Sequence, residues 1–382
     1  MYDQIRGDVI FIMLYAIAMA QAMASCCYLL FRRGNAFADD ITPPLRLRRW
    51  TAALFGFIVL NHLWYMPLFF LDSEEEVRMV DFIGGLLDGV TFFPLAIIVL
   101  LAMLQDRRRP LWHVAVLMMP VLVISALSFV IPFNVFLPLF WWCFLLMSVS
   151  LIVYLLHAVR QYGRWLRENY ADLEHKEVWQ SIVVIIIVLL VFGVYAFTGE
   201  GPVYQYAMRV IILVLVSYLL WRVETLSDLS LSVSEAEEAE VAAAGEEEMA
   251  ATTEEEKYIS SLSFRNYIGP MLKQHCEEPE LYLQYDLSLS SLARQVGINR
   301  TYLSRYFSMQ GITYNAYING LRIQYFMKLY TKLYRETDAL QKPQTVQQLA
   351  SQSGFRSYST FSGAFKQMMG MTPTEWMRNL KK

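Results

Sequence analysis

Near the carboxy terminus, basic and hydroxylated side chains gather directly after two glycine-containing turns, at Gly297 and Gly354. Guanidinium, ammonium and hydroxyl groups donate hydrogen bonds to phosphate oxygens and to base edges. The first group comprises Arg300, Thr301, Ser304 and Arg305, and the second comprises Arg356, Ser357, Tyr358, Thr360 and Lys366. Residue types of this kind suit a polyanionic partner, which the charge alone does not name.

The first group lies on a helix whose limits can be read from the sequence. The preceding helix is indicated by apolar residues with i, i+3, i+4, i+7 spacing: Leu289, Leu292, Ala293 and Val296. Gly297 then supplies a left-handed helix stop, and Asn299 caps the next helix. That second helix is expected to bury Leu303 and Phe307 and to turn the basic and hydroxyl groups outward.

The same pattern recurs about sixty residues later. Leu349 and Ala350 precede Gly354, Ser357 is the expected cap, and Phe361 and Phe365 are the expected core contacts. Each copy closes with another stop and cap, Gly311-Ile312-Thr313 in the first and Gly370-Met371-Thr372-Pro373 in the second. A generic repeat of helical hairpins would explain the apolar spacing. It would not explain why both second helices carry basic or hydroxylated outer faces.

Three stretches carry a resemblance to a known family: LSLSSLARQVGINRTYLSRYF, YINGLRI and GFRSYSTFSGAFKQMMGMTP. Residues 281–380 resemble the DNA-binding domain of AraC/XylS-type transcription regulators. The resemblance implies two helix-turn-helix units bridged by one long helix, beginning near Thr313 and carrying Arg322. It also implies that each second helix enters the major groove of duplex DNA, where the two groups named above read bases, and that Lys366 and the capped helix starts hold phosphates. We expect such a regulator to recruit RNA polymerase.

This chain departs from the family pattern in three places. Gly363 stands where the second recognition helix often has a basic residue, which favours phosphate contact over base reading there. The connection from Tyr330 to Val346 is longer than usual. The cupin domain usual in such regulators is absent, and residues 1–222 are strongly apolar instead.

Charge divides the chain into three parts. Residues 1–222 carry 16 basic and 16 acidic residues, residues 223–256 carry 12 acidic and no basic ones, and residues 257–382 carry 16 basic and 7 acidic ones. The middle segment cannot bury a core and is expected to be a linker, a solvated spacer or one whose carboxylates compete with DNA for the basic domain. A net charge of +9 in the last segment fits a polyanionic partner.

Seven apolar runs in the first 222 residues are long enough to cross a bilayer, which takes about 20 helical residues. They are Val9–Phe31, Thr51–Leu71, Met79–Leu104, Leu111–Ile131, Val135–Val159, Ser181–Phe197 and Val203–Trp221. Most basic residues of this part fall in alternate loops: Arg32, Arg33, Arg46, Arg48, Arg49, Arg107, Arg108, Arg109, Arg160, Arg164, Arg167, Lys176 and Arg222. The positive-inside rule then predicts an outer amino terminus and a cytoplasmic carboxy terminus, in the inner membrane of a bacterium.

Four polar residues fall at similar depth within these runs: Asn61, His62, Asp88 and Arg209. An intramembrane charge is costly and suggests a function. An Arg209–Asp88 ion pair is expected. The group is either a polar pocket open to the outside that senses a ligand, or a buried pair that fixes helix packing.

The predicted fold class is all-α: a seven-helix transmembrane bundle (1–222), an acidic linker (223–256) and a cytoplasmic double helix-turn-helix domain (257–382). We expect a membrane-integrated one-component transcription regulator whose DNA binding is controlled by the membrane part. Pairing as a homodimer would raise occupancy of repeated sites.

There are two alternatives. The DNA-binding part is released by proteolysis, or the chain is a transporter whose DNA domain regulates its own operon. No catalytic motif, metal-ligand cluster or cofactor motif is present in the sequence, so neither an enzyme nor a cofactor is expected.

Overall fold

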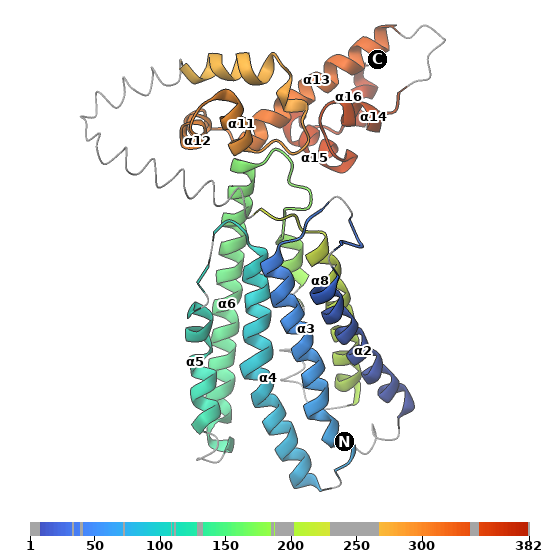
Figure 1. The fold of residues 1–382 in the computed structure, drawn as a ribbon, viewed down its shortest axis with the longest axis vertical. Helices are drawn as coiled ribbons and strands as arrows, with labels where there is room; N and C mark the ends of the chain where they lie inside the picture. The colour runs from blue at the N-terminus through green and yellow to red at the C-terminus, as the bar shows by residue number, and fades with distance from the viewer. Residues whose placement is uncertain are drawn as a thin grey trace, which may run out of the picture. The chain divides into compact units, whose positions relative to one another are not determined.

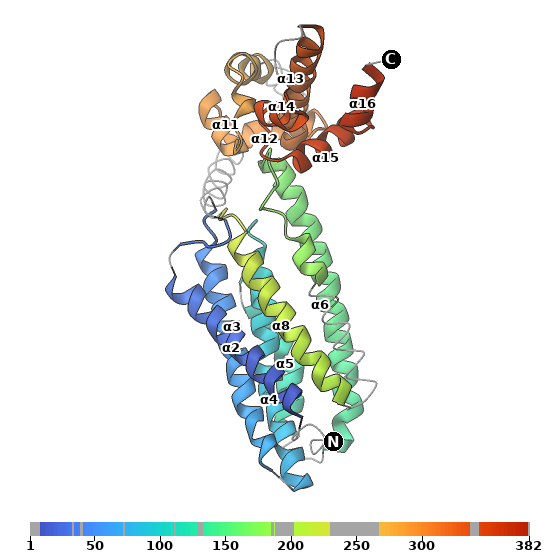
Figure 2. The ribbon, with the colours of Figure 1, turned by 90° about the vertical axis from the view of Figure 1, so that its right-hand side faces the viewer.

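The computed structural model describes residues 8–32, 34–38, 41–71, 73–107, 109–110, 112–127, 133–184, 187, 202–229, 267–336 and 344–380. The chain forms two compact units (Figures 1 and 2). Unit 1 comprises Met1–Tyr162 and Val178–Ser230, and unit 2 comprises Gly163–Glu177 and Leu231–Lys382. The described elements are helical, as expected, and one isolated antiparallel bridge joins Tyr170 to Ser288.

Unit 1 is built from long apolar helices. They are α2 (Val9–Phe31), α3 (Leu45–Tyr65) with its 3-10 continuation η1 (Met66–Phe69), α4 (Glu74–Met103), α5 (Trp112–Leu127), most of α6 (Phe133–Asn169), a short helix at 179–184, and α8 (Pro202–Glu224). Helix α3 packs between α2 and α4, while α8 packs against α2 and α3, as both views show. The last turns of α6, from Gly163 on, belong to unit 2.

Four of the described helices are long and apolar enough to cross a membrane: Val9–Phe31, Leu45–Phe69, Leu145–Asn169 and Gln205–Glu224. The first predicted run has the same bounds as α2, and the seventh lies within α8. The stretch Val90–Met103 is a shorter apolar helix. Most of the sixth predicted run, and part of the turn between the fourth and the fifth, lie outside the described residues. A count of seven spans therefore stays a prediction.

Several arginines expected as loop charges are buried against polar partners instead. The Nε atom of Arg48 lies 3.1 Å from Oε1 of Glu224, and the Nη1 atom of Arg109 lies 2.7 Å from Oδ1 of Asp106. Arg222 donates from Nε to Oγ of Ser181 at 3.1 Å. The arginines at these helix ends therefore also stabilise the packing of unit 1 through buried polar contacts.

The expected acidic linker begins with residues that pack in unit 1. The side chain of Glu224 is fully buried, and Leu226 and Leu229 are also buried. Gln105 holds this stretch by donating to the carbonyl of Ser227 and accepting from the amide of Leu229, both at 2.9 Å. The rest of the expected linker, from residue 230, lies outside the described residues.

Unit 2 contains both predicted helix-turn-helix copies. Its elements after residue 266 are a helix at 267–272 that continues as the π-turn η2 (Lys273–Glu277), then η3 (Leu281–Leu283), α11 (Leu289–Val296), α12 (Arg300–Met309), α13 (Tyr314–Glu336), α14 (Val346–Gln352), α15 (Tyr358–Met369) and α16 (Pro373–Leu380). The predicted glycine stops have positive φ: Gly297, Gly311, Gly354 and Gly370. The long bridging helix is α13, which begins one residue after Thr313.

Two separate cores hold the two copies. The first core includes the predicted Leu292, Leu303 and Phe307. The second includes Phe361 and Phe365, which are both fully buried. Helix α13 contributes to both cores, so it fixes where one copy lies relative to the other.

Arg322 of α13 is a deeply buried cation of unit 2, with a residue exposure of 1%. It donates from Nε to the carbonyl of Tyr282 at 2.7 Å and from Nη2 to the carbonyl of Gln284 at 2.6 Å. Its guanidinium carbon lies 5.6 Å from the ring centroid of Phe355, in the second core. Burial lowers the pKa of Arg322. A single side chain thus joins the loop before α11, helix α13 and the second copy.

The turn at Gly354 gives the first prediction. Its φ is +84°, and a Cβ there would lie 2.8 Å from Cα of Leu283. Gly354→Ala should lower the free energy of unfolding of unit 2 by about 1–3 kcal/mol, because backbone strain and a backbone clash add. Urea-dependent proteolysis of the full chain in detergent measures this. Gly363→Ala is the control, since a Cβ there meets nothing within 4 Å; equal losses in the two variants would contradict the argument.

The burial of Arg322 gives the second prediction. Arg322→Met should destabilise unit 2 by about 3 kcal/mol, because it leaves buried carbonyls without donors. The same proteolysis assay measures the change. Arg378→Met, at an exposed position of α16, should stay within about 0.5 kcal/mol of the parent chain. A loss below about 1 kcal/mol at Arg322 would show that water replaces the guanidinium.

Candidate nucleic-acid interface

Side-chain caps fix the amino ends of α12 and α15. The Asn299 carboxamide oxygen accepts from the amide of Thr301 at 2.9 Å. The Ser357 hydroxyl accepts from the amide of Thr360 at 3.3 Å. The predicted caps are therefore present, and each helix presents its first turn with a defined start. Because Ser357 is the cap of α15, its hydroxyl positions the helix in this structure.

The predicted contact residues differ in how far solvent reaches them. Exposed side chains are Arg305 on α12 and Tyr358 and Lys366 on α15. Half-buried ones are Arg300, Thr301, Ser304, Arg356, Ser357 and Thr360. The sequence predicted outward basic and hydroxylated faces on both helices, whereas the residues of the second set are partly covered.

Two of the half-buried residues, Arg300 and Thr360, contact a polar segment that sequence reasoning treated only as a charged loop. We define the clasp segment as Gly163–Glu177. Arg300 donates from Nη2 to Oδ1 of Asn169. Thr360 donates from Oγ1 to Oε2 of Glu174 at 3.2 Å. Both recognition helices are thus contacted at their first turns by one stretch of chain that precedes them by more than a hundred residues.

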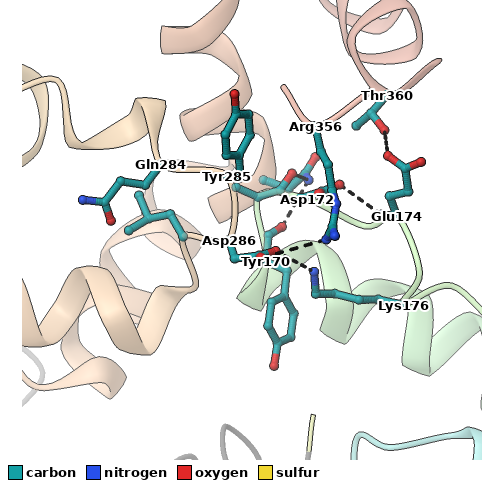
Figure 3. Close-up of polar contacts among 12 residues, drawn as sticks. Tyr170, Asp172, Glu174, Lys176, Gln284, Tyr285, Asp286, Arg356 and Thr360 are labelled. Carbon is teal, nitrogen blue, oxygen red and sulfur yellow. Dashed lines mark hydrogen bonds and ion pairs between the residues drawn. The ribbon is translucent and has the colours of Figure 1, made fainter. Parts of the chain in front are cut away.

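A carboxylate next to α11 joins the same network. Nη1 of Arg356 lies 3.9 Å from Oδ2 of Asp286, and Nζ of Lys176 lies 3.5 Å from Oδ1 of the same residue. Figure 3 shows Glu174 pointing to Thr360, with Lys176 and Arg356 both pointing to Asp286. Asp286 is largely exposed while Lys176 is buried, so the network lies at the edge of the surface.

Helix α15 carries Gly363 at the position where the family pattern often has a basic side chain. Gly363 is exposed and has no neighbouring atom within 4 Å of a Cβ position. The departure noted in the sequence therefore leaves a gap in the outer face. Lys366, three residues on, is exposed and supplies a positive charge to this helix.

The predicted intramembrane polar residues come together in unit 1. Asn61 donates from Nδ2 to Oδ1 of Asp88, and Tyr65 donates to Oδ2 of Asp88 at 3.1 Å. Nη1 of Arg209 lies 3.3 Å from Nε2 of His62, and Arg209 also exerts a Coulombic attraction on Asp88. The four residues thus form one polar group across α3, α4 and α8.

Two tyrosines complete this group, and sequence reasoning did not include them. The guanidinium carbon of Arg209 lies 4.6 Å from the ring centroid of Tyr15, whose hydroxyl donates to the carbonyl of His62. Tyr65 is the second, through its hydrogen bond to Asp88. The sequence could have indicated this contact, because the Tyr65 hydroxyl falls at the depth of Asp88 and a buried tyrosine hydroxyl usually finds a hydrogen-bond partner.

Comparison with known proteins bears on unit 2 alone. Residues 292–379 match a family model described as a helix-turn-helix domain. Uncharacterised HTH-type transcriptional regulators of Staphylococcus aureus strains COL and MSSA476 are each 29% identical to this chain over 106 residues. The match covers 28% of this chain and 13% of each relative, so the chain spans only a small part of their length. No solved structure matches the chain significantly.

The matched residues cover both recognition helices and the helix that bridges them. The match, the paired capped helices and the basic charge agree with one another. The carboxy-terminal part of this chain is therefore an AraC-type helix-turn-helix DNA-binding domain, like that of the transcription regulators it resembles.

Proposed function

We propose that this chain is a membrane-integrated one-component transcription regulator. It binds duplex DNA in a sequence-specific way through two helix-turn-helix units, and its transmembrane part controls that binding. The observation that carries the proposal is the presence, on one chain, of two capped recognition helices and of helices apolar enough to cross a membrane. A chain that joins the two can bring a signal met at the membrane to DNA directly.

The DNA-facing residues follow from the geometry of the two helices. Arg300 is the first residue of α12, and Arg356 directly precedes the cap of α15, so a guanidinium lies near the start of each helix. Bidentate arginine contacts to guanine are the commonest specific contacts in the major groove. Arg305 is placed for base reading, and Lys366 for a phosphate. Thr301, Ser304, Tyr358 and Thr360 complete the proposed contact set.

The membrane part supplies control and location. Seven spans, with an outer amino terminus, place the DNA-binding domain in the cytoplasm of a bacterial cell. The polar group around Asp88 and Arg209 is the proposed site at which the signal is received. Ionisable side chains inside a bilayer are costly, and those that occur there usually have a function. RNA polymerase and a second copy of this chain are the proposed protein partners, and no catalytic step or cofactor is part of the function.

Genome-wide DNA occupancy of the carboxy-terminally tagged full chain tests the proposal, with membrane and soluble fractions blotted from the same cells. Sharp peaks upstream of a few operons, with an intact band in the membrane fraction, are the expected result. Peaks together with a short soluble band would favour proteolytic release. An absence of peaks in cells shown to contain the protein, across growth conditions, would contradict the proposal.

Base reading by α12 has its own test. Arg305→Ala should weaken binding to a target duplex by about 1–3 kcal/mol and relax preference at one base pair. Lys366→Ala should instead weaken binding to all duplexes equally and reduce the salt dependence by about one counterion. Selection from a random-sequence duplex pool measures the preference. A uniform loss with Arg305→Ala would make Arg305 a phosphate contact.

A further inference from the structure

In this structure the DNA-binding domain contacts a segment of its own chain, the clasp segment. The clasp segment pairs with the loop before α11 through the bridge from Tyr170 to Ser288, and the amide of Ala171 donates to the carbonyl of Leu287 at 3.5 Å. Ala171 is fully buried and belongs to the first core of unit 2. The segment is therefore packed into the domain.

Two asparagines of α13 hold the backbone of the clasp segment. Asn315 donates from Nδ2 to the carbonyl of Ala171 at 2.7 Å and to that of Tyr170 at 3.1 Å. Asn319, which is buried, donates to the carbonyl of Ala171 at 3.2 Å. Side-chain amides that bind backbone carbonyls fix the path of an extended peptide, because each carbonyl is otherwise left without a donor.

From this anchor, the side chains of the segment extend to the amino ends of both recognition helices. Asn169 accepts from Arg300 at the start of α12, and Glu174 accepts from Thr360 in the first turn of α15. Glu174 thus brings a carboxylate to the helix end that would otherwise attract a phosphate. Asp286 pairs with both Lys176 of the segment and Arg356, so that arginine belongs to the same network.

We propose that the clasp segment and DNA compete for one surface, so that the domain binds DNA only when the segment leaves it. This inference rests on the proposed function, since it assigns a regulator to the same DNA-binding surface. A guanidinium or hydroxyl proton donated to Asn169 or Glu174 is not available to a base or a phosphate. The carboxylate of Glu174 also repels the phosphate backbone.

The clasp segment is bound at a cost, which makes its release feasible. Asp172 is 3% exposed, and its Oδ1 accepts from the amide of Glu174 at 3.0 Å, whereas its Oδ2 is a buried oxygen with no hydrogen-bond partner in the described part of the chain. Burial raises the pKa of Asp172. A buried carboxylate with half of its acceptors unmet opposes the favourable contacts of Ala171 and Glu174. Because the segment begins with the last turns of α6, a rearrangement of the apolar helices can shift this balance.

The first test measures DNA affinity of the purified full chain in lipid nanodiscs, with a fluorescent pool of random-sequence duplexes as the probe. Glu174→Ala removes the acceptor of Thr360, and Ala171→Glu puts a charge where no space or solvent exists. Both changes leave the DNA-contacting residues intact. The apparent Kd should fall by about 3–10-fold for Glu174→Ala and by at least as much for Ala171→Glu, because a larger fraction of molecules is competent to bind.

The matched control is Glu168→Ala, which makes the same charge change at an exposed position of the clasp segment. Any gain in affinity from net charge alone appears in this variant too. An equal affinity for Glu174→Ala and Glu168→Ala would overturn the inference. A gain cannot arise from misfolding of the DNA-binding domain, since a damaged domain would lose affinity.

A cross-link tests the closed state directly. Tyr170→Cys and Ser288→Cys, in a chain without the four native cysteines, place thiols at the bridge between the segment and the domain. Oxidation should weaken DNA binding by about tenfold or more, and reduction should restore it. Each single-cysteine variant, oxidised alike, is the control.

The outcomes separate this inference from the function on which it rests. Equal DNA binding by the cross-linked and the reduced protein would overturn competition while leaving the DNA-binding function intact. Failure of every form, including the reduced protein and the Glu174→Ala variant, to bind any duplex would remove both proposals together.

Discussion

Unit 2 depends on the buried guanidinium of Arg322. Its hydrogen bonds hold the carbonyls of Tyr282 and Gln284, so they fix the loop that leads into α11. Through Phe355 the same side chain touches the second core. The loop that it fixes continues into Asp286, which pairs with Arg356 and Lys176. One buried cation therefore sets the spacing of the two recognition helices and also the edge on which the clasp segment lies.

Much of unit 2 could be predicted from the sequence because its signals are local. A glycine stop, a side-chain cap and apolar residues at helical spacing all act within a few residues, and these predictions are confirmed for Gly297, Asn299 and Phe361. The contacts of Asn169 and Glu174 could not be predicted in this way. Their partners lie 131 and 186 residues away, and a polar loop carries no periodic pattern that would point to them. The same limit explains why Arg300 and Thr360 were expected to face solvent.

In unit 1, hydropathy located apolar helices, but it fixed the ends of only some of them and none of their pairing. The first run was found with its observed bounds, because an apolar helix between polar flanks is bounded by composition alone. Helix α6 extends beyond its predicted end to Asn169, since its last turns are polar and are stabilised in unit 2. Arg48 counts as a topological charge in the sequence, yet it is buried with Glu224 in the structure. A basic residue can thus follow the positive-inside rule and also form a buried ion pair at a helix end.

The clasp segment and the surface that it covers are parts of one polypeptide, and this has a consequence for how such a regulator would behave in a growing cell. Their encounter is unimolecular, so the fraction of closed molecules does not depend on how many are made. A separate inhibitor protein could be outnumbered by overproduction of its target. On the proposed competition, each new molecule is synthesised together with its own inhibitory segment. A duplication of the gene would raise the amount of regulator and leave its threshold unchanged.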